Sequence, residues 1–179
     1  MVDLDDAVDK YTTAFSVLNP YNTKHPITLR ELASHTSGLP RENPCSGCTE
    51  AEVLGHCQCC PCCAVGKATH AAVHPCASTC TLGLQVLAAV AKRFLLFPQF
   101  TRGHYSNLGY ALLGRTLGHA AAMSYEDYEV SNILRPMGMP HADFDYGAYQ
   151  RAHMAVGVSD DGTVEPITGW SGWEAPAGG

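Results

Sequence analysis

The stretch from Gly103 to Ala122, GHYSNLGYALLGRTLGHAAA, constrains the fold of this chain more than any other segment. It places a phenol, a hydroxyl and a carboxamide side by side at Tyr105, Ser106 and Asn107, directly before an apolar run of helical period. Ser106 or Asn107 can cap the start of this helix by accepting hydrogen bonds from its first backbone N–H groups. A polar Tyr-x-Asn pair at the end of a helix indicates a site.

The helix that follows Asn107 is predicted to be buried. Two apolar stripes with four-residue spacing support this: Leu108 and Leu112, and then Leu113, Leu117 and Ala121. Gly114 and Gly118 each weaken a helix by roughly 1 kcal/mol relative to alanine. Their presence predicts a neighbour that packs very close to the helix backbone.

The segment before this helix carries its own start and stop signals. Thr28 and Glu31 have the spacing of a capping box, in which each side chain satisfies a backbone N–H group of the other residue. This predicts a short helix from about Leu29 to Ser34 that stops at Gly38. The turn from His35 to Pro40 contains Ser37, which has no neighbouring base in sequence and is expected to shape the turn rather than to act as a nucleophile.

Three further elements are expected. The first is an apolar helix near 83–97, and the second is a helix over 125–134 that Ser124 caps and that Pro136 and Gly138 end. The third is a short β-hairpin with arms at 153–159 and 163–167, joined by Asp160-Asp161-Gly162.

Composition restricts the class of function. Apolar residues make up 46% of the chain and charged residues 16%, which is typical of a folded globular protein. A net charge of −6 provides no basic surface for nucleic acid. The apolar run from Leu82 to Phe97 contains Lys92 and Arg93 and is too short to span a bilayer. No secretory or other targeting signal is visible, so the sequence leaves the compartment open.

All nine cysteines lie between Cys45 and Cys80. Cys45 and Cys48 have metal-ligand spacing, and several Cys and His residues follow, so a zinc site is one interpretation. A disulfide near Cys45 and Cys48 is a second. The crowded CQCCPCC run lacks the paired spacing of a structural metal site, which counts against zinc. The favoured interpretation is an atypical Cys-rich insertion over about 55–95, either disordered or an artefact such as a retained intron.

Four stretches together resemble the serine β-lactamase and penicillin-binding-protein family, in its class C, esterase and eukaryotic β-lactamase-like branch. They are ITLRELASHTSGLP (27–40), GHYSNLGYALLGRTLG (103–118), SYEDYEVSNILRPMGM (124–139) and GWEAPAGG (172–179). The resemblance implies an α/β (α+β) fold of the β-lactamase/DD-peptidase type. This chain would supply mainly its helical subdomain plus the short β-hairpin, as a partial domain over 1–179.

The resemblance also implies a chemistry. In this family a Ser-x-x-Lys turn supplies the acyl nucleophile, a Tyr-x-Asn element faces it, and a Lys/His-x-Gly strand completes the pocket. Tyr105 would then be the general acid/base and Asn107 the substrate-binding amide. The substrate would be a small-molecule or peptide amide or ester, and neither a metal nor an organic cofactor would be needed.

Two of the three family elements have no counterpart in these 179 residues. No serine lies three positions before any of the four lysines, and neither Lys-x-Gly nor His-x-Gly follows Asn107. Without a nucleophile, acyl transfer should fall to the rate that binding and positioning alone provide. We therefore expect an internal fragment of a serine hydrolase that is catalytically incomplete. The alternatives are a non-catalytic binding or assembly module and a Cys/His metal-binding protein.

Overall fold

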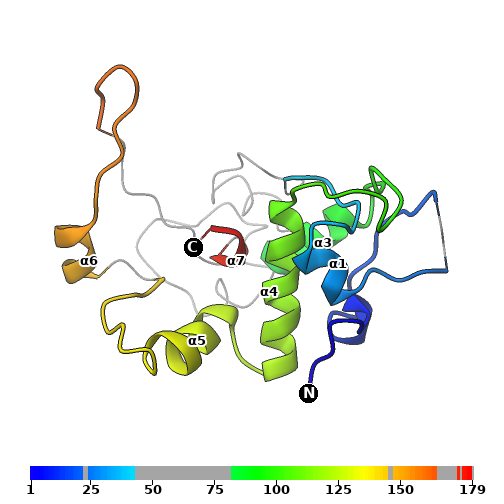
Figure 1. The fold of residues 1–179 in the computed structure, drawn as a ribbon, viewed down its shortest axis with the longest axis horizontal. Coiled ribbons are helices and arrows are strands. Elements are labelled where there is room, and N and C mark those ends of the chain that lie inside the picture. The colour runs from blue at the N-terminus through cyan, green and yellow to red at the C-terminus, as the bar shows by residue number, and fades with distance from the viewer. Residues whose placement is uncertain (22–23, 43–81, 145–146, 165–172, 174, 179) are drawn as a thin grey trace, which may run out of the picture. The chain divides into compact units, whose positions relative to one another are not determined.

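The computed structural model describes residues 1–21, 24–42, 82–144, 147–164, 173 and 175–178. The chain divides into two compact units, Met1–Gly109 and Tyr110–Gly179. The helical elements in chain order are η1 (Val8–Lys10), α1 (Leu29–Ala33), α3 (Leu82–Val90), α4 (Asn107–Ala121), α5 (Tyr125–Glu129), η2 (Val130–Leu134), α6 (Ala148–His153) and α7 (Ala175–Gly178) (Figure 1). α4 begins at the end of the first unit and continues in the second.

The first unit contains the predicted capping box. The Thr28 hydroxyl oxygen accepts a hydrogen bond from the Glu31 backbone N–H, and the Glu31 carboxylate accepts one from the Thr28 backbone N–H at 2.7 Å. α1 follows from this cap, as expected. The predicted stop at Gly38 is wrong, because His35 already adopts the left-handed region (φ 57°) and ends the helix directly after Ser34.

Gly38 has a different role, in the turn after the helix. Its φ of +77° lies in the left-handed region, and a side chain there would meet the backbone carbonyl of Phe97. The Gly38 carbonyl accepts a hydrogen bond from the Leu96 N–H at 2.8 Å. Ser37 beside it is buried, and its Oγ accepts a bond from the Leu39 N–H at 3.3 Å. These contacts hold the turn against the segment that precedes Tyr105.

The helix predicted near 83–97 forms, but it ends at Val90. The prediction of its C-terminal half is wrong because residues 93–95 pair with the N-terminal segment instead. The Leu18 N–H donates to the Arg93 carbonyl at 2.9 Å, and the Leu95 N–H donates to the Leu18 carbonyl at 3.0 Å. Of the apolar residues of this segment, Leu95 reaches the core and is only 2% exposed, whereas Phe94 and Leu96 on either side of it are exposed.

Aliphatic side chains from the described segments of the first unit form a core, and their removal from water stabilises the unit. The buried residues are Val8, Ile27, Leu29, Leu32, Leu39, Val86, Leu87, Val90, Leu95 and Leu108.

In the second unit, α4 buries one face. Ala111, Leu112 and Thr116 are almost fully buried. The second predicted stripe is more exposed, since Leu117 is 39% exposed and Ala121 is exposed, so the predicted burial of the helix holds for one of its two stripes only. A single buried face is typical of a surface helix.

The two helix glycines have the close neighbours that the sequence predicts. A Cβ at Gly114 would lie 2.5 Å from the Cβ of Pro176 in α7. A Cβ at Gly118 would lie 2.9 Å from the Met123 carbonyl oxygen. Both sites therefore require a residue without a side chain.

The predicted helix after Ser124 is confirmed as α5 and η2. The Ser124 hydroxyl accepts a bond from the Asp127 N–H at 3.0 Å and so caps α5. The helical path continues through η2 to Leu134. Gly138 follows with a φ of +75°, in agreement with the predicted stop.

The predicted hairpin stays a prediction. A single antiparallel bridge joins Val158 and Val164, and Gly162 takes a φ of +85° in the turn between them. The end of the second arm, at 165–167, lies outside the described residues. α6 was not predicted, because its N-cap residue is Gly147, which provides no side-chain cap.

No helix in the described part of the chain is both long and apolar enough to cross a bilayer.

Candidate functional site

Ser106 fixes the start of α4 in the first unit. Its buried Oγ accepts a hydrogen bond from the Gly109 N–H at 2.8 Å and donates one to the Pro40 carbonyl at 2.7 Å. Its backbone N–H donates to Nδ1 of His35 at 3.1 Å. Ser106 is therefore the predicted cap, and it also joins the helix to the turn at 35–40. An atom committed in this way is poorly placed to attack a substrate.

Tyr105, the residue before the cap, is directed outward. It is 54% exposed, so its phenol is accessible to solvent. Its ring lies 4.6 Å from the imidazole of His35 between ring centroids, with the two planes 39° apart. The guanidinium carbon of Arg41 lies 5.8 Å from the centre of the Tyr105 ring, within cation–π range. The phenol is thus supported by an aromatic and a cationic neighbour.

Asn107 is the first residue of α4, and its carboxamide is held by Glu42. Nδ2 lies 3.1 Å and 3.3 Å from the two Glu42 carboxylate oxygens. An ionised carboxylate only accepts hydrogen bonds, so it fixes which side of the amide is Nδ2. Glu42 itself pairs with Nε of Arg41 at 2.9 Å. Consequently one charged pair contacts both Tyr105 and Asn107.

His35 lies behind these residues, within the left-handed turn that ends α1. Its carbonyl accepts a hydrogen bond from the His104 N–H at 2.7 Å. Burial, and next the positive field of nearby His104, lower the pKa of the His35 imidazole below its usual value of 6.5. His104 packs edge-on against Phe97 at 5.1 Å between ring centroids. The neutral form of His35 is therefore favoured near neutral pH.

The structure thus places both predicted site residues, Tyr105 and Asn107, on either side of the Ser106 cap. Their partners His35, Arg41 and Glu42 were missed by sequence reasoning. Each partner lies more than 60 residues away in sequence, and no local pattern marks it. The earlier turn, HTSGLPRE, was the nearest signal, since all three partners come from it or directly follow it.

The proposed metal candidates Cys45 and Cys48, and the whole Cys-rich insertion apart from residues 82–95, lie outside the described residues. Within the residues that the structure does describe, no group of three or more His, Cys, Asp or Glu side chains could hold a metal ion.

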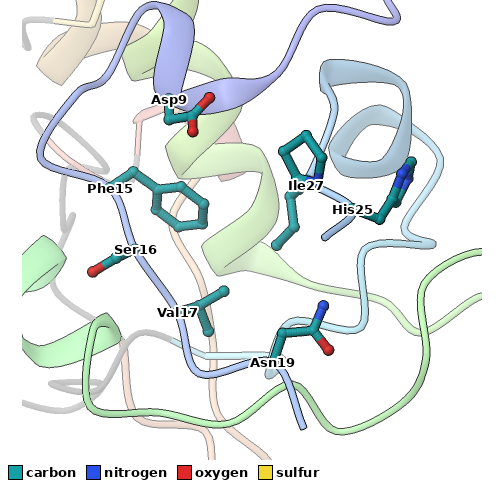
Figure 2. A pocket seen from close by; sticks show the side chains of 8 residues that line it. Asp9, Phe15, Ser16, Val17, Asn19, His25 and Ile27 are labelled. Atoms are coloured by element: carbon teal, nitrogen blue, oxygen red, sulfur yellow. The ribbon is translucent and has the colours of Figure 1, made fainter. Parts of the chain in front are cut away.

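A separate pocket lies elsewhere in the first unit and was not predicted. It measures about 210 Å³ and is lined by Asp9, Phe15, Ser16, Val17, Asn19, His25, Pro26 and Ile27. Phe15 and Ile27 face each other across the hollow, while the Ser16 hydroxyl points away from it (Figure 2). Neither Tyr105 nor Asn107 lines this pocket, so it is distinct from the site at the start of α4.

The sequence and the fold of the chain are similar to those of known proteins. The chain matches the family model described as Beta-lactamase over residues 1–179. It is 37% identical, over 98% of its length, to Beta-lactamase-like protein 2 of Dictyostelium discoideum, of which it covers 28%. It is also similar to a solved β-lactamase/D-alanine carboxypeptidase from Yersinia pestis in complex with citrate (TM-score 0.56, 29% identity, 83% of this chain and 35% of that one).

A class C β-lactamase structure gives a TM-score of 0.63 at 20% identity, over 93% of this chain and 36% of that one, and shows a shared fold. The chain therefore spans between 28% and 36% of the length of these three proteins.

Proposed function

The chain belongs to the β-lactamase family and has a β-lactamase/DD-peptidase-like fold, and from this we propose that Tyr105 and Asn107 form one wall of a serine acyl-enzyme pocket. Tyr105 is the general acid/base and Asn107 is the amide that binds the substrate. The substrate class is a small-molecule or peptide amide or ester, and β-lactams, D-Ala-D-Ala-type peptides and small esters all belong to it.

One observation supports this proposal most: hydrogen bonds and ring contacts hold the Tyr-x-Asn pair at the start of α4 while the Tyr105 phenol stays exposed. The Ser106 cap fixes the backbone of the pair, and the pair of Arg41 and Glu42 fixes its side chains. Positioning of this kind lowers the entropic cost of bringing reacting groups together. A merely structural tyrosine at a helix start would not need such support.

The geometry suggests a division of labour between the two side chains. The phenolic oxygen of Tyr105 is positioned to pass a proton to or from a reacting group. Glu42 engages Nδ2 of Asn107, and this leaves Oδ1 to accept a hydrogen bond from an N–H group of the substrate. The pocket wall therefore combines one proton carrier with one fixed hydrogen-bond acceptor.

The acyl nucleophile is the part that this wall requires and that these 179 residues do not supply, since they contain no Ser-x-x-Lys sequence. Hence we propose that the chain binds substrate-like molecules weakly and does not form an acyl-enzyme. Amide or ester hydrolysis belongs to a longer protein in which a nucleophile faces Tyr105.

An NMR titration of the ¹⁵N-labelled chain with benzylpenicillin tests this proposal. In the wild type we expect saturable shifts at the Asn107 side-chain amide and at the Tyr105 backbone amide, and in Asn107→Ala, which has no side-chain amide, we expect the Tyr105 shift to be lost. The matched control is Asn132→Ala, since Asn132 is also a helical asparagine whose Nδ2 is engaged, by the Tyr128 carbonyl at 3.1 Å. Equal binding by wild type and Asn107→Ala would refute the role of Asn107.

A further inference from the structure

We propose that neutral His35 is a positioning residue for Tyr105, and that protonation of His35 releases the Tyr105–Ser106 end of α4. This inference rests on the proposed function only for the role of Tyr105 as acid/base. The structural event itself can be measured without substrate.

A hydrogen bond joins the Ser106 backbone to the His35 imidazole. The Ser106 backbone N–H donates to Nδ1 of His35 at 3.1 Å. A ring nitrogen can accept this bond only when it carries no proton, so the imidazole is neutral and its proton is on Nε2. A protonated His35 would turn an N–H group toward another N–H group, and the bond would be lost.

The same imidazole also contacts the ring of Tyr105. Their centroids are 4.6 Å apart. Because Tyr105 directly precedes Ser106, one side chain holds both the backbone and the aromatic ring at this point. A change in the His35 imidazole therefore acts on the position of the phenol as well as on the helix cap.

His35 has an unfavourable backbone conformation. A φ of 57° is uncommon for a residue with a side chain, and such strain persists only where the surroundings enforce it. Two bonds from the 100–104 segment do so, from the Phe100 N–H to the Thr36 carbonyl at 3.0 Å and from the His104 N–H to the His35 carbonyl at 2.7 Å. These two bonds, on the carbonyls of His35 and Thr36, hold the backbone of His35 independently of its contact with Tyr105.

The elements packed against His35 carry charged and titratable groups of both signs, and of these only His104 lowers the pKa of His35, after burial. On the 102–105 segment they are Arg102, His104 and Tyr105, on α1 they are Arg30 and Glu31, and on the turn they are Arg41 and Glu42. The two carboxylates are engaged elsewhere, Glu31 by Thr28 and His25, and Glu42 by Arg41 and Asn107. Burial and His104 lower the pKa of His35 accordingly.

The sign of the pH dependence follows. The unfolded chain binds a proton at His35 more readily than the folded chain does. The contribution of His35 to stability is therefore complete above pH 6.5 and is lost as the pH falls from 6.5 through the lower pKa of the folded state. Release of Tyr105 and Ser106 should follow the same window.

The test uses NMR on the intact chain with ¹⁵N-histidine and ¹³Cε-tyrosine labels. We expect the His35 signals to show the tautomer protonated at Nε2 and to titrate with a midpoint below 6.5. Hydrogen-exchange protection of the Ser106 amide, corrected for intrinsic rate, should fall about fivefold or more below that midpoint, as for loss of one typical hydrogen bond. The Tyr105 ring signals should move with the same midpoint.

Two variants sharpen the test. In His35→Asn the residue tolerates the left-handed backbone but lacks the imidazole, so we expect Ser106 protection to be low and pH-independent. His119→Asn changes an exposed histidine of α4 and should leave the transition unchanged. A Ser106 amide equally protected above and below the His35 midpoint, or a Tyr105 transition that persists in His35→Asn, would overturn the inference. Neither result depends on penicillin binding, so the proposed function is tested separately.

Discussion

At the scale of single residues, Ser106 organises the site. A serine at this position could have been taken for a nucleophile, since it lies between Tyr105 and Asn107. Its Oγ is instead used twice, as acceptor for the Gly109 N–H and as donor to the Pro40 carbonyl. The hydroxyl therefore provides structure, and the neighbouring side chains remain available for chemistry.

Ser106→Ala should lower the free energy of unfolding by about 1–2 kcal/mol, because it removes the helix cap and leaves the Pro40 carbonyl without this donor. Urea denaturation followed by circular dichroism measures the change. Ser124→Ala is the matched control, because the Ser124 Oγ also caps a helix and also donates one bond, to the Asp127 carboxylate at 2.7 Å, but at an exposed position before α5. We expect it to cost about 0.5–1 kcal/mol. A loss at Ser106 no larger than the loss at Ser124 would show that burial of the two Ser106 bonds adds nothing to the stability.

At the scale of elements, the close approach of α7 to α4 explains a costly glycine. Alanine is the better helix former by roughly 1 kcal/mol, so Gly114 is unfavourable for α4 considered alone. The Pro176 ring fills the space where a side chain would be, and Tyr125 Cδ2 lies 3.1 Å from the same point. The lower helix propensity of Gly114 is thus the cost of packing α7 against α4.

Gly114→Ala should therefore destabilise the second unit by about 1–3 kcal/mol despite its better propensity, since overpacking outweighs the gain. Chemical denaturation measures this. Gly103→Ala, where nothing lies within 4 Å of the added Cβ, should change stability by less than about 0.5 kcal/mol. Removing both obstructing atoms of Pro176 in the double variant Gly114→Ala/Pro176→Gly should recover most of the loss, relative to Pro176→Gly alone. If the double variant is as unstable as the single one, contact with Pro176 is not the cause.

The elements also show what the sequence can and cannot predict. The caps at Thr28, Ser106 and Ser124 were predictable because a cap depends on residues only three positions apart. The helix near 83–97 was predicted too long because its end is set by pairing with Leu18, which lies 75 residues before Arg93. Periodicity in a window carries no information about such a distant partner.

At the scale of the whole molecule, the order and spacing of the motifs predicted both the family and the site residues. The family is confirmed. The contacts that support the site were not predictable. His35 and Glu42 meet Ser106 and Asn107 across 71 and 65 positions. Only the fold brings them together, so their roles could not be inferred from the motif itself.

The missing Ser-x-x-Lys motif also concerns the whole molecule, because catalysis in this family requires all three motifs together. A bound substrate would meet Tyr105 and Asn107 but no activated serine. We therefore expect the chain to bind such molecules without acyl transfer.

Intact-protein mass spectrometry after incubation with benzylpenicillin, and in parallel with a fluorophosphonate probe, tests this central claim most directly. We predict an unchanged mass for the 179-residue chain with both reagents, under conditions in which an active serine hydrolase is fully labelled. A stoichiometric adduct on the folded chain, absent after denaturation, would mean that it contains an activated nucleophile and would contradict the account.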